Sequence, residues 1–271
     1  MSFFIGNKDL MLKPNIRIWS NTSRINSKIY ISQGTCPANG YETNDIVYLD
    51  NSRVPKGPLR PAVQEELDLL VTNKWRLGAQ SVGVLELLSL DEIPSIQTLD
   101  DWVLRGSEGD ISIEAKFAKW LALRARGKLN FSEIIKYHRV CMDKVNLTTV
   151  SFDPVSCRYV GLHLDTWPGM PIGFNRLCVN LGPYPRLFLF IPQPLKVLLQ
   201  LSAITRSSEH KNIARVFMEN FPSYPVIGVK IDPGWAYLAP TTQIVHDAAC
   251  PDAEGPIYHL AMWGDFVPTE A

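Results

Sequence analysis

The sequence predicts an α+β protein, in which a partly helical N-terminal portion packs on a β-rich C-terminal half. Two patterns predict this division. From about residue 150 the chain is a series of short apolar or alternating runs broken by proline and glycine, as in the strands of a sandwich or barrel. Before that point, apolar residues recur at helical spacing. No GxGxxG or Walker-type loop is present, so nothing supports a nucleotide-binding α/β fold.

The N-terminal portion, residues 1–150, begins with short strand-like pieces and then becomes mainly helical in this prediction. Helices are expected over 61–75, 110–127 and 131–145, where apolar stripes fit packing against a core. A chain of 271 residues is long enough for one large core. We therefore expect 1–150 to support or cover the other portion, residues 151–271, within one integrated domain.

The C-terminal half, residues 151–271, is expected to contain seven strands and one helix. The helix should begin near Ser207 or Ser208 and extend to residue 221. The expected strands cover residues 158–165, 176–182, 186–192, 226–234, 235–240, 243–248 and 257–266.

The composition excludes several classes of partner. Lys plus Arg and Asp plus Glu both number 27, so no basic excess indicates binding to nucleic acid or to an anionic membrane. The start of the chain lacks the apolar run of a signal peptide, and no run reaches membrane-spanning length. The five cysteines are an odd number without CxxC spacing, which favours free thiols over a disulfide framework or structural zinc. We therefore expect a cytoplasmic protein.

A candidate metal site begins in the segment GLHLDTW, residues 161–167. Residues two apart in a strand face the same way, so His163 and Asp165 should point to one side. His246, in a strand-like segment near the end of the chain, can supply a third ligand. Two imidazoles and one carboxylate form the facial triad of non-haem Fe(II) oxygenases. Two alternatives stay open: a simple hydrogen-bonded pair of His163 and Asp165, and His259 in place of His246 as the third ligand.

Several segments of the C-terminal half resemble one family. The stretches HLDTW, NRLCVNLGPYPRLFLFIP, DPGWAYLAPTTQIVHDA and YHLAMWGDF are similar to the Fe(II)/2-oxoglutarate-dependent dioxygenases of the cupin superfamily. The resemblance covers about residues 155–266, in an arrangement like that of JmjC and asparaginyl-hydroxylase members. Its motifs are the HxD, the distal histidine and GWAYLAP before it, although the histidine comes one residue later than usual. The resemblance implies a double-stranded β-helix (jelly roll).

The resemblance also implies a function. Fe(II) would be bound by His163, Asp165 and His246, with 2-oxoglutarate and dioxygen as co-substrates. The enzyme would hydroxylate or otherwise oxidise an unactivated C–H bond of a small molecule, such as an amino acid or a natural-product intermediate, and release succinate and CO2. A peptidyl substrate is also compatible with this family, and the oligomeric state is left open.

The sequence departs from the family where the distal carboxylate of 2-oxoglutarate should be bound. Many members place an arginine about ten residues after the distal histidine, but no Arg or Lys follows His246 here. The arrangement in JmjC-like members makes Arg186 the first choice for this role and Arg176 the second. Asn180 or Tyr184 would complete the clamp.

The missing downstream arginine keeps two other functions open. One is a cupin metalloenzyme that does not use 2-oxoglutarate, such as a cupin dioxygenase or a metal-dependent isomerase. The other is a non-catalytic, cupin-like protein that binds a sugar or another ligand. Both alternatives keep the predicted β-rich core, and they differ in the chemistry of the site.

Overall fold

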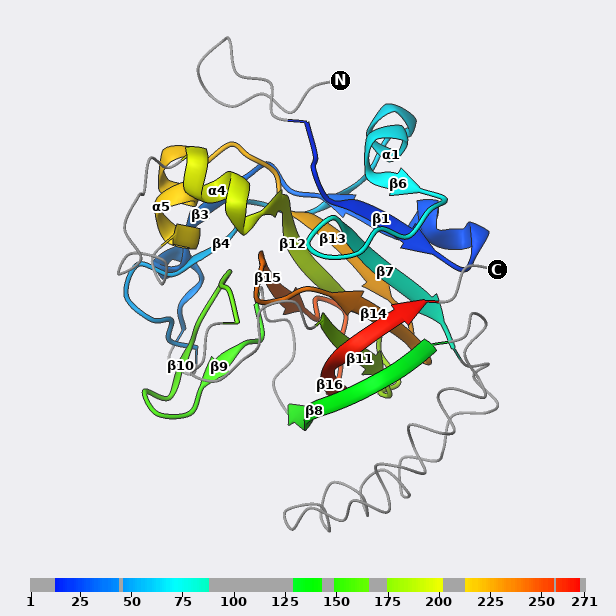
Figure 1. The fold of residues 1–271 in the computed structure, drawn as a ribbon. Helices are drawn as coiled ribbons and strands as arrows, with labels where there is room; N and C mark the ends of the chain where they lie inside the picture. The colour runs from blue at the N-terminus through cyan, green and yellow to red at the C-terminus, as the bar shows by residue number, and fades with distance from the viewer. Residues whose placement is uncertain are drawn as a thin grey trace.

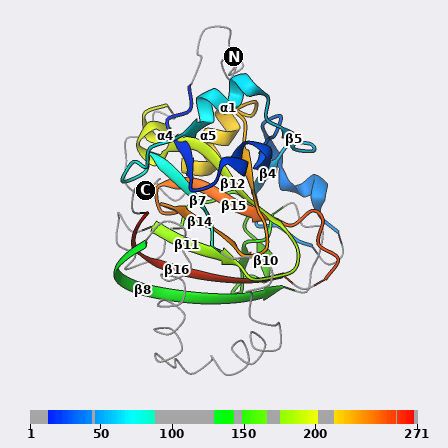
Figure 2. The ribbon, with the colours of Figure 1, turned by 90° about the vertical axis from the view of Figure 1, so that its right-hand side faces the viewer.

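Two β-sheets packed face to face form the body of the protein (Figure 1). The computed structural model describes residues 13–43, 46–87, 129–142, 149–165, 175–201, 213–255 and 257–268. Three α-helices lie in the described parts of the chain: α1 (Gln64–Leu70), α4 (Leu195–Leu201) and α5 (Ile213–Asn220). They lie on the opposite side of the molecule from β8 and β16 (Figure 2). None of the helices in the described residues is long and apolar enough to cross a membrane.

The larger sheet has seven strands. Strand β1 runs parallel to the two strands beside it, and all other adjacent strands of the sheet are antiparallel. Its strands, in spatial order, are β6 (Val71–Thr72), β1 (Arg17–Ser20), β7 (Ser81–Glu86), β14 (Trp235–Ala239), β11 (Asn175–Asn180), β16 (Ile257–Pro268) and β8 (Leu129–Met142).

The smaller sheet is antiparallel throughout and has five strands. In spatial order they are β15 (Ile244–Ala249), β12 (Arg186–Pro194), β13 (Ile227–Ile231), β2 (Ile29–Ile31) and β5 (Arg60–Pro61). Two short strand pairs lie outside both sheets: β3 (Thr35–Pro37) pairs with β4 (Arg53–Pro55), and β9 (Phe152–Asp153) pairs with β10 (Arg158–Tyr159). The described residues also form two 3-10 helices, η1 (Ser23–Lys28) and η2 (Ala38–Tyr41).

Alternation along the strands separates the core from the outer face. Phe188 and Phe190 of β12 point between the sheets, where Phe188 stacks on Tyr237 of β14 with ring centroids 4.0 Å apart. The intervening Leu189 and Ile191 face the other way and pack with α4 and α5. The smaller sheet is therefore buried on both faces, which explains why β12 reads as a continuous apolar run.

The expected strands of the C-terminal half are confirmed from β11 to β16. The first expected strand, 158–165, is only partly regular: β10 ends at Tyr159, and His163 forms an isolated bridge. The helix expected over 207–221 is present as α5 from Ile213, while its predicted start near Ser207 lies outside the described residues.

The prediction of a mainly helical N-terminal portion is wrong for the described residues. The segment 131–145 was expected to be a helix, but residues 129–142 form strand β8, which pairs with β16 along its length. Ile134, Ile135 and Val140 are β-branched, and the free edge of β16 satisfies the backbone of β8; together these override the helical spacing.

The other two expected N-terminal helices have different outcomes. The helix expected over 61–75 is shortened to α1, because Val71 and Thr72 join β1 as β6. The helix expected over 110–127 lies outside the described residues.

Candidate metal centre

His163 and His246 are brought together by the backbone. His163 donates its amide to the His246 carbonyl at 3.0 Å and accepts the His246 amide at 2.8 Å. Residues directly opposite in such a bridge carry their side chains on the same side. The two ring centroids consequently lie 4.8 Å apart. Asp165 follows two residues later, and its amide donates to the Thr241 carbonyl at 3.1 Å.

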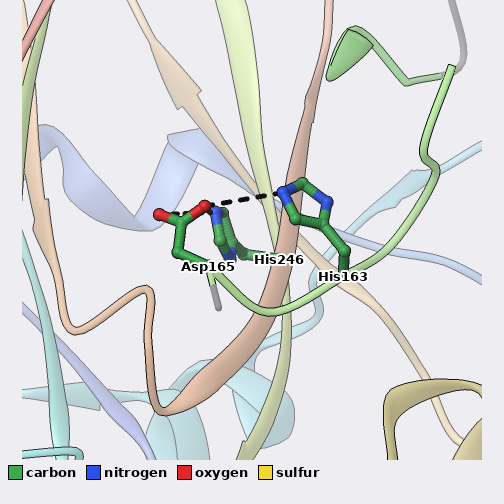
Figure 3. A group of neighbouring side chains, drawn as sticks. All are labelled: His163, Asp165 and His246. Atoms are coloured by element: carbon green, nitrogen blue, oxygen red, sulfur yellow. Dashed lines mark ion pairs between the residues drawn. The ribbon is translucent and has the colours of Figure 1, made fainter. Parts of the chain in front are cut away.

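The three side chains converge on one point (Figure 3). His163 Nε2 lies 3.6 Å from Asp165 Oδ1, and His246 Nε2 lies 3.7 Å from Asp165 Oδ2. These separations are too long for hydrogen bonds. They are within the roughly 4 Å that can separate two donor atoms bound to one ion at ordinary bond lengths. One potential ligand atom from each residue lies within 4.8 Å of the others.

Hydrogen bonds to backbone carbonyls set the tautomer of both histidines. The Nδ1 atom of His163 lies 2.7 Å from the Gly161 carbonyl oxygen, and that of His246 lies 3.2 Å from the Ile244 carbonyl oxygen. A carbonyl oxygen only accepts, so each Nδ1 carries the proton and each Nε2 keeps its lone pair. This is the state in which an imidazole binds a metal.

Two atoms of the group are buried without hydrogen bonds. His246 Nε2 and Asp165 Oδ2 have no hydrogen-bond partner among the residues that the structure describes. Buried polar atoms are normally satisfied, so each of these needs a partner. A cation between the three side chains would satisfy both, and the residues therefore fit a bound metal.

The electrostatics hold Asp165 and His246 in the forms that a metal requires. Burial by itself would raise the pKa of Asp165, but His246, His163 and Arg176 hold that pKa well below its usual range. Burial, with smaller contributions from His163 and Arg176, lowers the pKa of His246 to about 3 against the opposing effect of Asp165. Near neutral pH the carboxylate is charged and the His246 imidazole is neutral.

His163 behaves differently. Burial alone would lower its pKa, but Asp165 and Asp247 raise it above the ordinary value for histidine. Protons therefore compete with a metal more strongly at His163 than at His246.

Gly161 places the carbonyl that orients His163. Its φ is +76°, and a Cβ atom at this position would lie 2.7 Å from the Arg53 carbonyl oxygen. Gly161→Ala should therefore cost about 1–2 kcal/mol of stability from backbone strain, with the contact to Arg53 adding to it. It should also weaken metal binding, because the Gly161 carbonyl would turn away from the His163 ring.

Gly78 provides a matched control for this prediction. Its φ is +73°, but a Cβ atom there would meet nothing within 4 Å. In thermal unfolding, Gly78→Ala should lose less stability than Gly161→Ala, and a Co(II) titration should show unchanged affinity. Equal Co(II) affinity in the two variants would contradict the role given to the Gly161 carbonyl.

Arg176 lies beside the candidate metal ligands. Its Nη1 atom is 3.9 Å from Asp165 Oδ2, and its guanidinium lies over the Trp263 ring at 4.9 Å from the centroid. Arg176 comes from β11 and Trp263 from its neighbour β16. The arginine thus supplies positive charge to Asp165 and is itself stabilised by the indole face.

Arg186, at the start of β12, is buried, and none of the residues that the structure describes gives it a carboxylate partner. Arg186 is 3% exposed, and its Nη1 atom lies 3.7 Å from the Cys178 sulfur. Its Nε has no hydrogen-bond partner in the described chain. No ion pair joins it to a carboxylate of the described residues. A buried guanidinium in this state is costly unless an anion neutralises it.

Asn180 is not free to bind a co-substrate, contrary to the sequence-based expectation. Its amide nitrogen donates to the Tyr184 and Ile231 carbonyls, both at 2.9 Å, and its Oδ1 accepts from the Gly182 amide at 3.2 Å. These bonds use the donors of the side chain to build the turn between β11 and β12. Tyr184 belongs to the same turn and packs beside Gly255.

His259, the alternative third ligand, lies in β16 of the larger sheet, opposite Asn180. The group that can hold a metal contains His246 and does not include His259.

No protein-family model matches the chain, and no curated protein sequence matches it either. Solved structures give weak likenesses. HygX from Streptomyces hygroscopicus with iron bound is 16% identical over 69% of this chain and 82% of that chain, with a TM-score of 0.37. HygX with nickel and 2-oxoglutarate bound is 14% identical over the same shares, also with a TM-score of 0.37.

A further likeness is to the Kdo hydroxylase KdoO, described as a non-haem Fe(II) α-ketoglutarate-dependent dioxygenase in complex with succinate and Fe(III). It is 15% identical over 71% of this chain and 80% of that chain, with a TM-score of 0.36. Because these identities and TM-scores are low, the side chains of this chain decide what its site can do.

The sequence alone did not assign a role to Tyr237 and Trp263, which lie near the two arginines. Tyr237 lies close enough to Arg176 and Arg186 to affect the pKa of each. Trp263 carries the guanidinium of Arg176. Alternation provides the signal that could have found them, because Tyr237 and Trp263 occupy inward positions of β14 and β16.

Proposed function

We propose that this protein is a non-haem Fe(II)/2-oxoglutarate-dependent oxygenase that hydroxylates or otherwise oxidises an unactivated C–H bond of a small molecule. One observation carries the proposal. His163, Asp165 and His246 turn metal-binding atoms toward one another, and the hydrogen bonds at Nδ1 of both histidines leave each Nε2 to face the ion. Two imidazoles and one carboxylate leave coordination positions open, which separates this set from a closed structural metal site.

The path of the chain supports a double-stranded β-helix as the finer description of the fold. From β8 the chain passes to the His163 bridge beside β15, then to β11, β12, β13, β14, β15 and β16 in turn. Along this path it alternates between the larger and the smaller sheet, with β12 and β13 as one consecutive pair in the smaller sheet. Such winding places the His163–Asp165 segment and β15 next to each other at one edge of the smaller sheet.

Iron bound at this site would supply the oxidising chemistry, in which 2-oxoglutarate and dioxygen are consumed, succinate and CO2 are released, and a substrate C–H bond is oxidised. The protein contributes the geometry. The backbone bridge fixes the two rings relative to each other, and the carbonyls of Gly161 and Ile244 keep both Nε2 lone pairs available. Asp165 supplies negative charge, and Phe188, which stacks on Tyr237, lies beside the His246 ring with the two ring centroids 6.0 Å apart.

Arg186 is the residue that we assign to the distal carboxylate of 2-oxoglutarate. Phe190 lies opposite His246 in the register of β12 and β15, and Arg186 lies four residues before Phe190 in β12. At about 3.3 Å per residue this is roughly 13 Å of strand. An arginine side chain spans part of that distance and a five-carbon diacid spans the rest. The carboxylate would supply the anion that the buried guanidinium does not find among the described residues.

A small-molecule substrate, such as an amino acid or a natural-product intermediate, fits the burial of the site. His246 is 2% exposed and Asp165 8%. We propose no nucleic-acid or membrane partner, because the charge is balanced. We propose a cytoplasmic location, because Cys36, Cys157, Cys178 and Cys250 are free thiols.

The test is turnover of 2-oxoglutarate by protein loaded anaerobically with Fe(II). After oxygen is admitted, succinate should form in an amount that depends on both iron and 2-oxoglutarate, and a panel of amino acids and small metabolites should include compounds that stimulate it. If purified protein binds neither Fe(II) nor 2-oxoglutarate, the proposal is wrong. Succinate formed only with peptides would assign a peptidyl substrate instead.

A second candidate is a cupin metalloenzyme that does not use 2-oxoglutarate. It is favoured by one observation, the lack of any Lys or Arg after His246. It predicts iron binding without 2-oxoglutarate binding. An isothermal titration of the Fe(II) protein with 2-oxoglutarate under anaerobic conditions distinguishes the two candidates.

A further inference from the structure

Asp247 is a buried carboxylate next to a proposed ligand. It follows His246 in β15, and its side chain is fully buried. Alternation along the strand directs it to the face opposite to that of His246. Direct coordination of the proposed metal is therefore not its role, and the cost of burying a carboxylate requires another explanation.

The two oxygens of Asp247 have different surroundings. Oδ1 accepts four hydrogen bonds, from the amides of Val150 (3.3 Å), Ser151 (3.1 Å) and Ala248 (2.7 Å) and from the Ser151 hydroxyl (2.9 Å). Oδ2 has no hydrogen bond among the described residues and lies 3.9 Å from Nδ1 of His163. One oxygen is thus used to anchor the side chain, and the other is left facing the imidazole.

The anchored segment leads directly to His163. The Ser151 carbonyl accepts the Val160 amide at 2.8 Å, and Gly161 follows with the carbonyl that binds His163 Nδ1. Asp247 therefore acts on the His163 ring in two ways, through the charge of Oδ2 and through the segment held by Oδ1.

We propose that Asp247 is a positioning residue for His163, and that its Oδ2 charge strengthens the binding of a divalent metal by that imidazole. Negative charge near the protonated nitrogen of a ligating histidine makes the opposite nitrogen a stronger donor. The negative charge also offsets part of the charge of the ion in a buried site. This inference rests on the metal site of the proposed function.

The experiment is a titration of metal-free protein with Co(II), followed by its visible absorption, for wild type, Asp247→Asn and Ser151→Ala. Asp247→Asn keeps an oxygen for the four donors and removes the charge facing His163. Its Kd for Co(II) should rise by about 10–100-fold. Ser151→Ala removes only the hydroxyl bond to Oδ1. It keeps the charge and the backbone bonds of residue 151 to Oδ1 and to Val160, so it should lower the Tm and leave the Kd within about twofold of wild type.

The outcomes separate this inference from the function on which it depends. If wild type itself does not bind Co(II), both are wrong. If wild type and Asp247→Asn bind Co(II) equally, or if Ser151→Ala raises the Kd as much as Asp247→Asn at a similar Tm, the role of Asp247 is only structural. If Asp247→Asn cannot be obtained folded, Asp247→Ser, which leaves room for water beside the donors, takes its place with the same expected rise and the same contradicting result.

Discussion

Replacing Asp165 with alanine is expected to abolish metal binding and 2-oxoglutarate turnover. Asp165 is the one carboxylate of the group that can hold a metal, and its two oxygens face the Nε2 atoms of His163 and His246. Without it, two imidazoles remain beside the positive charge of Arg176, with no carboxylate to offset the charge of the ion. Changes around metal ligands cost 10–100-fold in affinity, so loss of a ligand should raise the Kd for Co(II) or Fe(II) by more than about 100-fold.

Asp165→Asn separates charge from shape in this prediction. It keeps the size of the side chain and removes its charge, so it should also bind metal poorly. Asp232→Asn is the matched control, since Asp232 pairs with Lys28 and is not one of the three candidate ligands. Metal binding is followed by titration, and folding by circular dichroism. Wild-type Co(II) affinity in a folded Asp165→Ala protein, or in His163→Ala, would contradict the assigned metal site.

The three candidate metal ligands could be predicted from the sequence because the prediction depends mainly on alternation along strands. Alternation predicts that His163 and Asp165 share a side, and His246 lies in a strand-like segment. The structure brings these three together through a single bridge rather than a long strand. The prediction needed only the side that each residue faces, so the irregular backbone after β10 did not affect it.

Other features depend on contacts that a single sequence does not reveal. The segment 131–145 has helical spacing, but pairing with the edge of β16 makes residues 129–142 a strand. Asn180 carries a side chain suited to binding a carboxylate, yet the turn after β11 uses its donors. The sequence shows only that Asp247 follows a candidate ligand, and its hydrogen bonds with Ser151 show which segment it holds.

Replacing Arg186 with alanine is expected to raise the KM for 2-oxoglutarate strongly while leaving metal binding nearly unchanged. The guanidinium is buried and lacks a carboxylate partner in the described chain, and it is not in contact with the metal group. A hydrogen bond to a charged group contributes about 1.5–3 kcal/mol, which corresponds to about a 10–150-fold rise in KM. Arg186→Lys should give an intermediate value, because lysine keeps the charge and loses the bidentate geometry.

Arg176→Ala is the matched comparison for Arg186→Ala. The positive charge of Arg176 lies beside the candidate ligand Asp165, so Arg176→Ala should remove a repulsion and strengthen Co(II) binding, with little change in the KM for 2-oxoglutarate. The two arginines therefore predict opposite splits between metal affinity and co-substrate affinity, measured on the same preparations. If Arg176→Ala raises the KM at unchanged Co(II) affinity and Arg186→Ala does not, the two assignments must be exchanged. If neither variant alters 2-oxoglutarate binding, the buried charge of Arg186 serves another anion, and the metalloenzyme without this co-substrate becomes the better account.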